Sequence, residues 1–206
     1  DIAGGSSVQP PSPGGNAAAN LAIINANLSS ALEARAFGSA TIQATSVNSF
    51  NAASSVLLIG RTLAQLSAAG TNANVNILGD VIVSASAGAL IPGGNATGGA
   101  AEIIASANGN ITITGNATVE ANGFGDIGFT SGAASGSGTG GSALVQADSN
   151  GDLTVSGNLT ILADGVGAFG GTTGVLGGAG TGGSARFLVG SPFLNDSNAT
   201  ATILGD

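Results

Sequence analysis

The sequence contains no cysteine, histidine, lysine or tyrosine, and it also lacks methionine and tryptophan. Without these side chains the chain has no disulfides, no thiolate or imidazole metal ligands, and no histidine, lysine, cysteine or tyrosine to act as a general base or covalent nucleophile. Clustered carboxylates are the remaining catalytic group, but the acidic residues are scattered along the sequence. The composition therefore predicts a protein that is not an enzyme and that carries no cofactor.

Charged residues are scarce, at 7%, and aromatic residues make up only 3%. Eleven acidic residues against three arginines give a net charge of −8, which disfavours binding to nucleic acid or to anionic lipid. No run of about 18 apolar residues is present, so the sequence predicts no membrane span. Disordered chains combine high charge with low hydropathy, whereas the mean hydropathy here is +0.42, which indicates a folded chain.

What the sequence has instead is an internal repeat. The tripeptide Thr-Gly-Gly recurs every 42 residues, starting at Thr97, Thr139 and Thr181. The segments 111–125 and 153–167 keep the same spacing, with the sequences ITITGNATVEANGFG and LTVSGNLTILADGVG. A fixed period of this size is typical of stacked supersecondary units. The alternation of apolar and polar residues within each segment indicates strands.

We therefore expect an all-β fold, a right-handed parallel β-helix or β-solenoid, in which short strands are joined by turns. Glycine recurs between strands, often before Asn or Asp, and these residue types tolerate the positive φ of a tight corner. The spacings fit coils of roughly 18–24 residues, about eight to ten in all, so each 42-residue repeat would hold two coils. The Asn side chains of neighbouring corners are expected to form hydrogen-bonded ladders. The predicted corner glycines are Gly38, Gly60, Gly79, Gly115, Gly157 and Gly205.

Two regions are expected along the chain. Residues 1–18 form a Pro/Gly-rich amino-terminal segment that is poorly suited to a strand ladder and is a candidate for contact between subunits. Residues 19–206 are expected to form a single β-solenoid domain. Its two-coil repeats are clearest at 97–138, 139–180 and 181–206.

Gly-rich stretches at 123–138 and 165–180 account for the differences in spacing. Insertions in solenoids map to turns, so we expect both stretches to leave one corner as long loop excursions. Phe124, Phe129 and Phe169 lie within them and are expected to pack these loops down onto the solenoid.

The strand register predicts the interior. The repeat places Glu102 beside Ser142 and Glu120 beside Leu162, so no column of acidic residues recurs. The side chains expected to point inward are Ile111, Ile113, Val119, Leu153, Val155, Leu159 and Ile161.

The pattern G-N-x-T-x-x-A-x-G, present at 115–123 and 157–165 and separated by T-G-G turns, resembles filamentous-haemagglutinin-like exoproteins of the two-partner secretion type. It is similar more broadly to the large repetitive adhesins of Gram-negative bacteria, and the best-matching stretch is about 75–206. The resemblance implies a right-handed parallel β-helix exported to the bacterial cell surface. There it would serve adhesion, biofilm structure or filament formation.

Two functions follow from this fold. The first is a non-enzymatic subunit of an extracellular filament or stalk, assembled by head-to-tail stacking of identical chains. The sequence ILGD at 203–206 repeats that at 77–80, which continues into a strand, so we expect an open coil that templates the next chain. The alternative is an adhesin module whose Gly-rich loops grip a glycan or a host receptor.

Two further sets of residues are candidate sites. The run 148–152 offers oxygen ligands for Ca²⁺ from Asp148, Asn150 and Asp152, although no bidentate glutamate follows at the expected position and a polar turn is the simpler interpretation. N-glycosylation sequons would lie on exposed turns if they are used. They begin at Asn27, Asn95, Asn110, Asn116, Asn158, Asn195 and Asn198.

Overall fold

The computed structural model describes residues 7–8, 21–24, 26–46, 48–127, 134–170, 176–190 and 198–205. All regular structure in these residues is β, and every strand pairing is parallel, so the predicted β-solenoid is confirmed. No helix long and apolar enough to cross a membrane occurs in this part of the chain.

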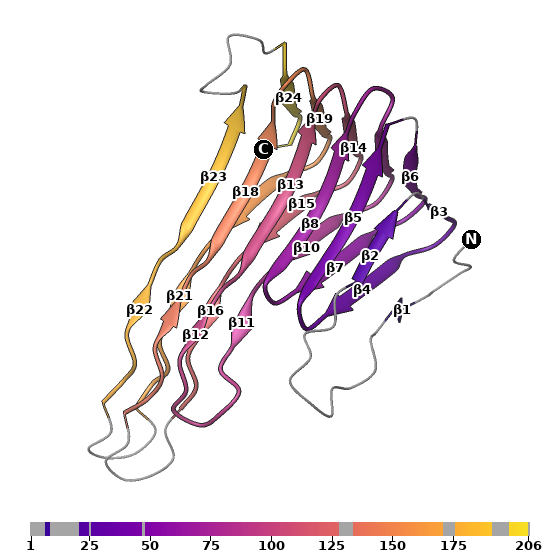
Figure 1. Ribbon diagram of the computed structural model, residues 1–206. Coiled ribbons are helices and arrows are strands. Elements are labelled where there is room, and N and C mark those ends of the chain that lie inside the picture. The colour runs from indigo at the N-terminus through magenta and orange to yellow at the C-terminus, as the bar shows by residue number, and fades with distance from the viewer. Residues whose placement is uncertain are drawn as a thin grey trace.

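Three sheets of six strands each form the solenoid body, stacked in chain order along one axis (Figure 1). Sheet A contains β1 (Ser7–Val8), β4 (Leu32–Ala36), β7 (Val56–Gly60), β10 (Val81–Ser84), β15 (Ala117–Glu120) and β20 (Leu159–Leu162). Sheet B contains β2 (Leu21–Ile24), β5 (Ser39–Thr45), β8 (Leu63–Ala69), β13 (Ala100–Ser106), β18 (Ser142–Ala147) and β23 (Ser184–Val189). Sheet C contains β3 (Asn27–Leu28), β6 (Ser49–Ala52), β9 (Asn74–Ile77), β14 (Asn110–Ile113), β19 (Asp152–Val155) and β24 (Thr200–Ile203).

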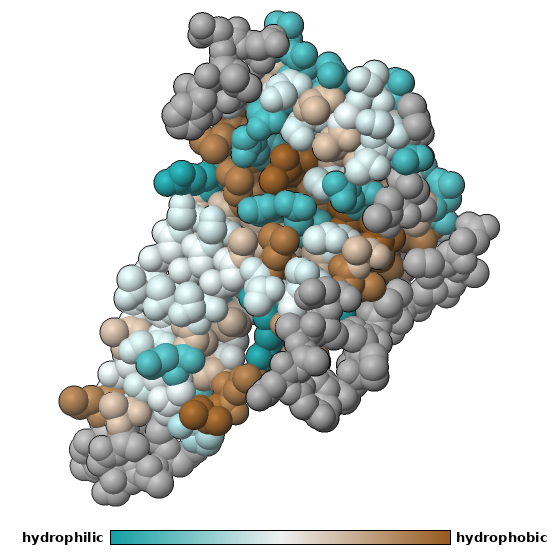
Figure 2. Space-filling view, viewed as in Figure 1, coloured by the Kyte–Doolittle hydropathy of each residue, from teal (hydrophilic) through white to brown (hydrophobic). Residues whose placement is uncertain are grey.

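A narrow projection leaves the body between sheets A and B in the last three coils (Figure 1). We call it the fin and define it as the described residues within 87–97, 123–139 and 165–181. One layer contains β11 (Ala87–Gly88), β16 (Gly123–Phe124) and β21 (Gly165–Val166). The other contains β12 (Ala96–Thr97), β17 (Gly138–Thr139) and β22 (Gly180–Thr181). Its visible surface is mostly pale, with apolar side chains near its far end (Figure 2).

The register corrects the predicted coil length. Val81 pairs with Ala117, and Ala117 pairs with Leu159, so each 42-residue repeat is one coil and the two-coil interpretation is wrong. Hydrogen bonds between neighbouring coils join residues that are 24 and 25 positions apart in the sequence in the early coils. This separation rises to 36, 42 and 48 positions in the later coils. The extra residues build the fin rather than a second turn of the solenoid. With six strands in each main sheet, the expectation of eight to ten coils is also wrong.

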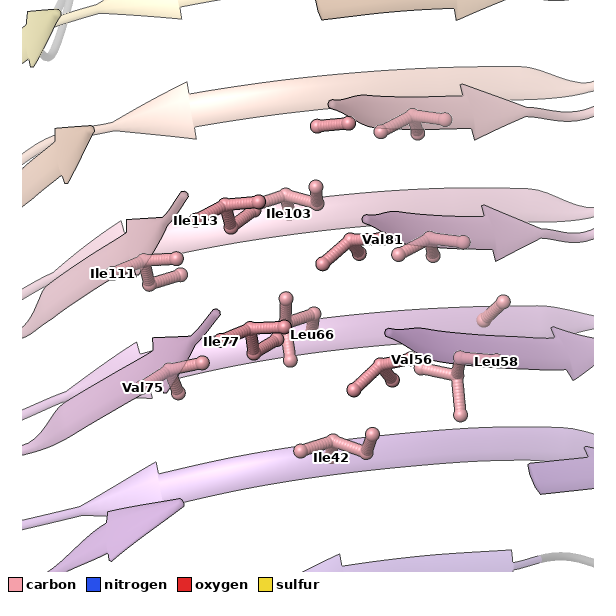
Figure 3. Close-up of a cluster of buried hydrophobic side chains, with 14 of the residues drawn as sticks. Ile42, Val56, Leu58, Leu66, Val75, Ile77, Val81, Ile103, Ile111 and Ile113 are labelled. Carbon is pink, nitrogen blue, oxygen red and sulfur yellow. The ribbon is translucent and has the colours of Figure 1, made fainter. Parts of the chain in front are cut away.

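The core lies inside the triangle of the three main sheets. Small and branched side chains fill it in aligned layers, so that Ile111 and Ile113 lie above Val75 and Ile77 (Figure 3). Of the residues predicted to point inward, five are fully buried: Ile111, Ile113, Val119, Leu153 and Val155. Leu159 and Ile161 hold the equivalent positions in the last coil but are only half-buried. The prediction of Glu120 beside Leu162 is confirmed, whereas Glu102 lies beside Leu144, not Ser142.

The predicted corner glycines lie at two different corners. Gly38 follows β4 and Gly60 ends β7, between sheets A and B. The other four lie between sheets C and A or directly after β24, at Gly79, Gly115, Gly157 and Gly205. None of the six has a positive φ, because the positive-φ glycines of the described chain are Gly70, Gly93 and Gly190. The conformational reason that we predicted for these glycines is therefore wrong.

Candidate interaction surfaces

The Thr-Gly-Gly repeats lie where the chain returns from the fin to the body. At this neck the chain leaving the body and the chain returning to it are joined by one short backbone hydrogen bond in each coil. Its length is 2.7 Å in the first of these coils and 2.6 Å in the next two. The donors are the N–H groups of Gly99, Gly141 and Gly183, and the acceptors are the carbonyls of Ala85, Ala121 and Ala163.

The two glycines of each repeat face opposite ways along the solenoid axis. A Cβ on Gly98 would lie within 3.0 Å of the Ala121 carbonyl in the next coil, and one on Gly140 would meet the Ala163 carbonyl in the same way. The second glycine faces backwards, since a Cβ on Gly141 would meet the backbone of the Thr-Gly-Gly before it. No side chain fits between coils at the neck, which explains the motif.

The last coil leaves this stacking surface uncovered. A Cβ on Gly182, the third equivalent of Gly98, would meet nothing within 4 Å. β20, β23 and β24 are the outermost strands of their sheets. Phe187 and Val189 align with buried Val145 and Ala147, yet they are 44% and 49% exposed. This end of the body therefore presents strand edges and apolar interior side chains together.

The other end of the body differs. Its outermost strands are β1, β2 and β3, one in each main sheet. Ile23 and Leu28 are buried there. The chain therefore has two chemically distinct ends that carry edges of the same three sheets.

The fin consists of two layers that pack backbone to backbone. A Cβ on Gly123 or Gly165 would lie within 3.0 Å of the carbonyl of Thr139 or Thr181 in the opposite layer. With no side chains between the layers, only the outward residues carry chemistry. On one side these are aligned threonines, Thr97, Thr139 and Thr181.

The opposite side of the fin is apolar. Phe124 and Val166 are paired neighbours in β16 and β21, with 43% and 46% exposure. Gly88 precedes them in the same column, and a Cβ there would meet nothing within 4 Å. We call the column Gly88, Phe124 and Val166 the apolar face. Farther out, exposed apolar side chains include Leu90, Ile91, Phe169 and Leu176.

These exposures correct the prediction that phenylalanines pack the Gly-rich segments down. Phe169 is 85% exposed and Phe124 points outward, while Phe129 lies outside the described residues. The excursions at one corner are confirmed, with paired strands next to the body at 123–124, 138, 165–166 and 180, while the described residues farther out have no regular secondary structure.

The predicted polar ladders are present at the corners. The side-chain oxygen of Asp80 accepts the N–H of Asn116 at 2.8 Å, and that of Asn116 accepts the N–H of Asn158 at 2.9 Å. A second ladder at the neck runs from Ser86 through Asn122 to Asp164, with distances of 3.1 and 2.8 Å. Each side chain holds the backbone of the next coil, so the ladders are structural contacts along the axis.

The calcium candidates form a corner turn between sheets B and C. Ser149 and Asn150 have positive φ, as do Ala107 and Asn108 one coil earlier. The Asp148 carboxylate accepts from Gln146 at 2.6 Å, Asn150 accepts the N–H of Asn198 at 3.2 Å, and Asp152 accepts from the Thr200 hydroxyl. Within the described residues no group of three or more acidic residues is placed to hold a metal ion. The three side chains thus serve separate structural contacts.

The sequon asparagines are exposed wherever the structure describes them, namely at Asn27, Asn95, Asn110, Asn116, Asn158 and Asn198, whereas Asn195 lies outside the described residues. Some are already engaged, since the Asn116 amide donates to Asp80 at 3.2 Å and the Asn95 oxygen accepts the N–H of Ser137 at 2.7 Å. A glycan on Asn116 would be attached to the amide nitrogen that donates to Asp80, and would therefore disturb this hydrogen bond.

The sequence predicted excursions at 123–138 and 165–180, but not the paired strands of the fin or its apolar face. The signal was a two-residue glycine period, at Gly123 and Gly125, at Gly136 and Gly138, and again one coil later. Such a period marks a strand with one bare face. No protein-family model, curated protein or solved structure matches the chain.

Proposed function

We propose that this chain is a non-enzymatic structural protein of the bacterial cell surface, a subunit of a filament or stalk that supports adhesion or biofilm. Its subunits stack head to tail, the last coil of one chain on the first coil of the next. The observation that carries the proposal is the repeated coil contact, in which parallel strands, close glycine backbone and polar ladders join each coil to the next along one axis. Its extracellular place rests on the resemblance to filamentous-haemagglutinin-like exoproteins.

Two physical features support axial stacking. Unpaired edges of parallel strands are templates for further strands, and exposed apolar interior side chains gain free energy when a further coil covers them. The two ends also carry edges of the same three sheets, so a head-to-tail contact continues sheets A, B and C across the junction. A heterologous contact of this kind does not close, and therefore generates a fibre.

Phe187→Glu tests the proposal. Phe187 is 44% exposed in the single chain, so the coils fold as before. In a stack this residue would lie inside the continued core, as its paired neighbour Val145 does, and an unpaired carboxylate there is costly. We expect negative-stain images of the purified wild-type chain to show fibres, and those of the variant to show short rods. Fibres of unchanged length from Phe187→Glu, or monodisperse wild-type rods at high concentration, would contradict axial stacking.

The alternative, a binding module for a glycan or host receptor, is favoured by one observation. Phe169, Leu90 and Leu176 are highly exposed near the far end of the fin, and an exposed phenylalanine ring can stack on the apolar face of a sugar. A glycan-array screen with the wild-type chain and Phe169→Ser distinguishes this function. Binding that depends on Phe169 in a chain that forms no fibres would favour the alternative.

A further inference from the structure

The outward face of sheet C carries a regular polar array. Alternation along each strand turns every second side chain away from the core, and the register aligns these side chains into two columns along the solenoid axis. We call the two columns together the sheet C array. One column contains Ser49, Asn74, Asn110, Asp152 and Thr200. The other contains Asn27, Asn51, Asn76, Thr112, Thr154 and Thr202.

The composition of the array sets this face apart from the other two. Asp152 is its one charged member, and every other member is Ser, Thr or Asn. On the outward face of sheet A, Glu33 aligns with Leu57, and on that of sheet B, Glu102 aligns with Leu144. A column of one chemical class, repeated from coil to coil, is therefore a property of sheet C rather than of the solenoid surface in general.

The side chains of the array are ordered before any ligand binds. The Asn51 amide donates to the side-chain oxygen of Asn27 at 2.7 Å and to the Ser49 hydroxyl at 3.2 Å. The β-branched threonines, Thr112 and Thr154 among them, have few rotamers. Binding therefore loses little side-chain entropy at this face.

The chemistry of the array fits a neutral, extended polysaccharide. Its hydroxyl and amide groups donate and accept hydrogen bonds, as sugar hydroxyls do. The array has no cation and the chain has a net charge of −8, so polyanions are repelled, and a single carboxylate offers no patch for a polycation. Successive rungs lie about 4.8 Å apart, close to the length of one pyranose residue in an extended chain. A polymer laid along the axis therefore meets the same pair of columns at every sugar.

Two exposed leucines border the array. Leu78 and Leu204 directly follow β9 and β24 on the outward side, and they are 56% and 67% exposed. Sugar rings present C–H groups beside their hydroxyls, so a polysaccharide gains from contact with these leucines as well as with the polar columns. The border thus favours a sugar polymer over a purely polar ligand.

We propose that the sheet C array binds a neutral, extended polysaccharide that lies along the solenoid axis, one sugar to each coil. This activity goes beyond that of a filament subunit and does not depend on axial stacking, because the array lies on the flank of the solenoid. In a fibre the arrays of successive chains would form one continuous track, and binding would strengthen through multivalency.

A matched pair of double variants tests the site. Thr112→Val with Thr154→Val removes two aligned hydroxyls from the array and keeps the β-branched shape. Thr118→Val with Thr160→Val makes the same change in the same two coils on the outward face of sheet A. We expect the wild-type chain to be retarded in native gels that contain hydroxyethyl cellulose and to sediment with microcrystalline cellulose. The sheet C variant should bind roughly tenfold more weakly, about the effect of two lost neutral hydrogen bonds, and the sheet A variant should bind like the wild type.

Four outcomes would overturn the proposal. They are wild-type chain that neither polymer retains, equal binding by the two double variants, equal retardation by the acidic polymer polygalacturonate, and loss of cellulose binding in Phe169→Ser, which would place the sugar on the fin. Sedimentation equilibrium tests a second copy as the occupant instead. Self-association that only the sheet C variant loses, in a chain that does not bind cellulose, would replace the polysaccharide by that second copy. Negative-stain images of the same samples score fibres separately, so their absence would contradict axial stacking and leave this site standing.

Discussion

At the scale of single residues, glycine in this chain serves close approach more than unusual backbone angles. A Cβ on Gly115 would lie within 3.0 Å of the backbone of Gly79 and Asp80 in the preceding coil. Positive φ is instead adopted by asparagines at the third corner, between sheets B and C, namely Asn72, Asn108 and Asn150. A repeating glycine therefore marks where coils touch, and its conformation cannot be inferred from its repetition.

Gly115→Ala is expected to destabilise the chain by about 1–3 kcal/mol, because the added methyl group overpacks a backbone contact. Urea unfolding followed by circular dichroism measures this difference. Gly88→Ala is the control, since its methyl group enters open space and should change the free energy of unfolding by less than about 0.5 kcal/mol. Equal midpoints for both variants would show that the corner relaxes without cost.

At the scale of elements, the side-chain ladders fix the register between coils. Asn122 is 7% exposed, donates its own N–H to Ser86 and accepts that of Asp164. Asn116 has the same role in an exposed ladder. Because water can replace a lost partner only at the exposed position, the two ladders should differ in their contribution to stability.

Asn122→Ala is expected to cost about 1–3 kcal/mol, since it leaves the Asp164 N–H without its acceptor in a half-buried neck. Asn116→Ala should cost less than about 1 kcal/mol. Amide hydrogen exchange locates the effect: protection should fall at Asp164 in the first variant and change little at Asn158 in the second. Similar losses at both sites would mean that burial does not set the strength of these ladders.

The elements of the body could be predicted from the sequence, because alternation in segments such as 111–113 reports directly which side chains face a core. The number of coils could not. A repeat of 42 residues is satisfied by two short coils or by one coil that carries a fin, and the period alone does not separate them. The excursions at one corner were predicted, but the paired strands within them were not, because the layers of the fin meet through glycine backbone and no apolar alternation marks these strands.

At the scale of the whole molecule, the proposed axial contact acts along the solenoid. The last coil offers it through Phe187 and Val189. An open contact of this kind lengthens a stalk. It would join chains of low charge and few aromatic residues into a fibre without disulfides.

Deletion of residues 1–18 tests how the first coil takes part in stacking. Part of this segment folds within its own chain, since β1 pairs with β4 through Ser7 and Val8. β1 is therefore the edge of sheet A that would meet β20 of the preceding subunit, and the opening residues Asp1 to Ala3 lie outside the described residues. We expect electron microscopy of the truncated chain to show shortened or absent fibres. Circular dichroism should still report folded coils, because β4 keeps its pairing with β7. Fibres of full length from the truncated chain would exclude a role for β1 in the junction, and side-by-side packing without axial contact would contradict the filament itself.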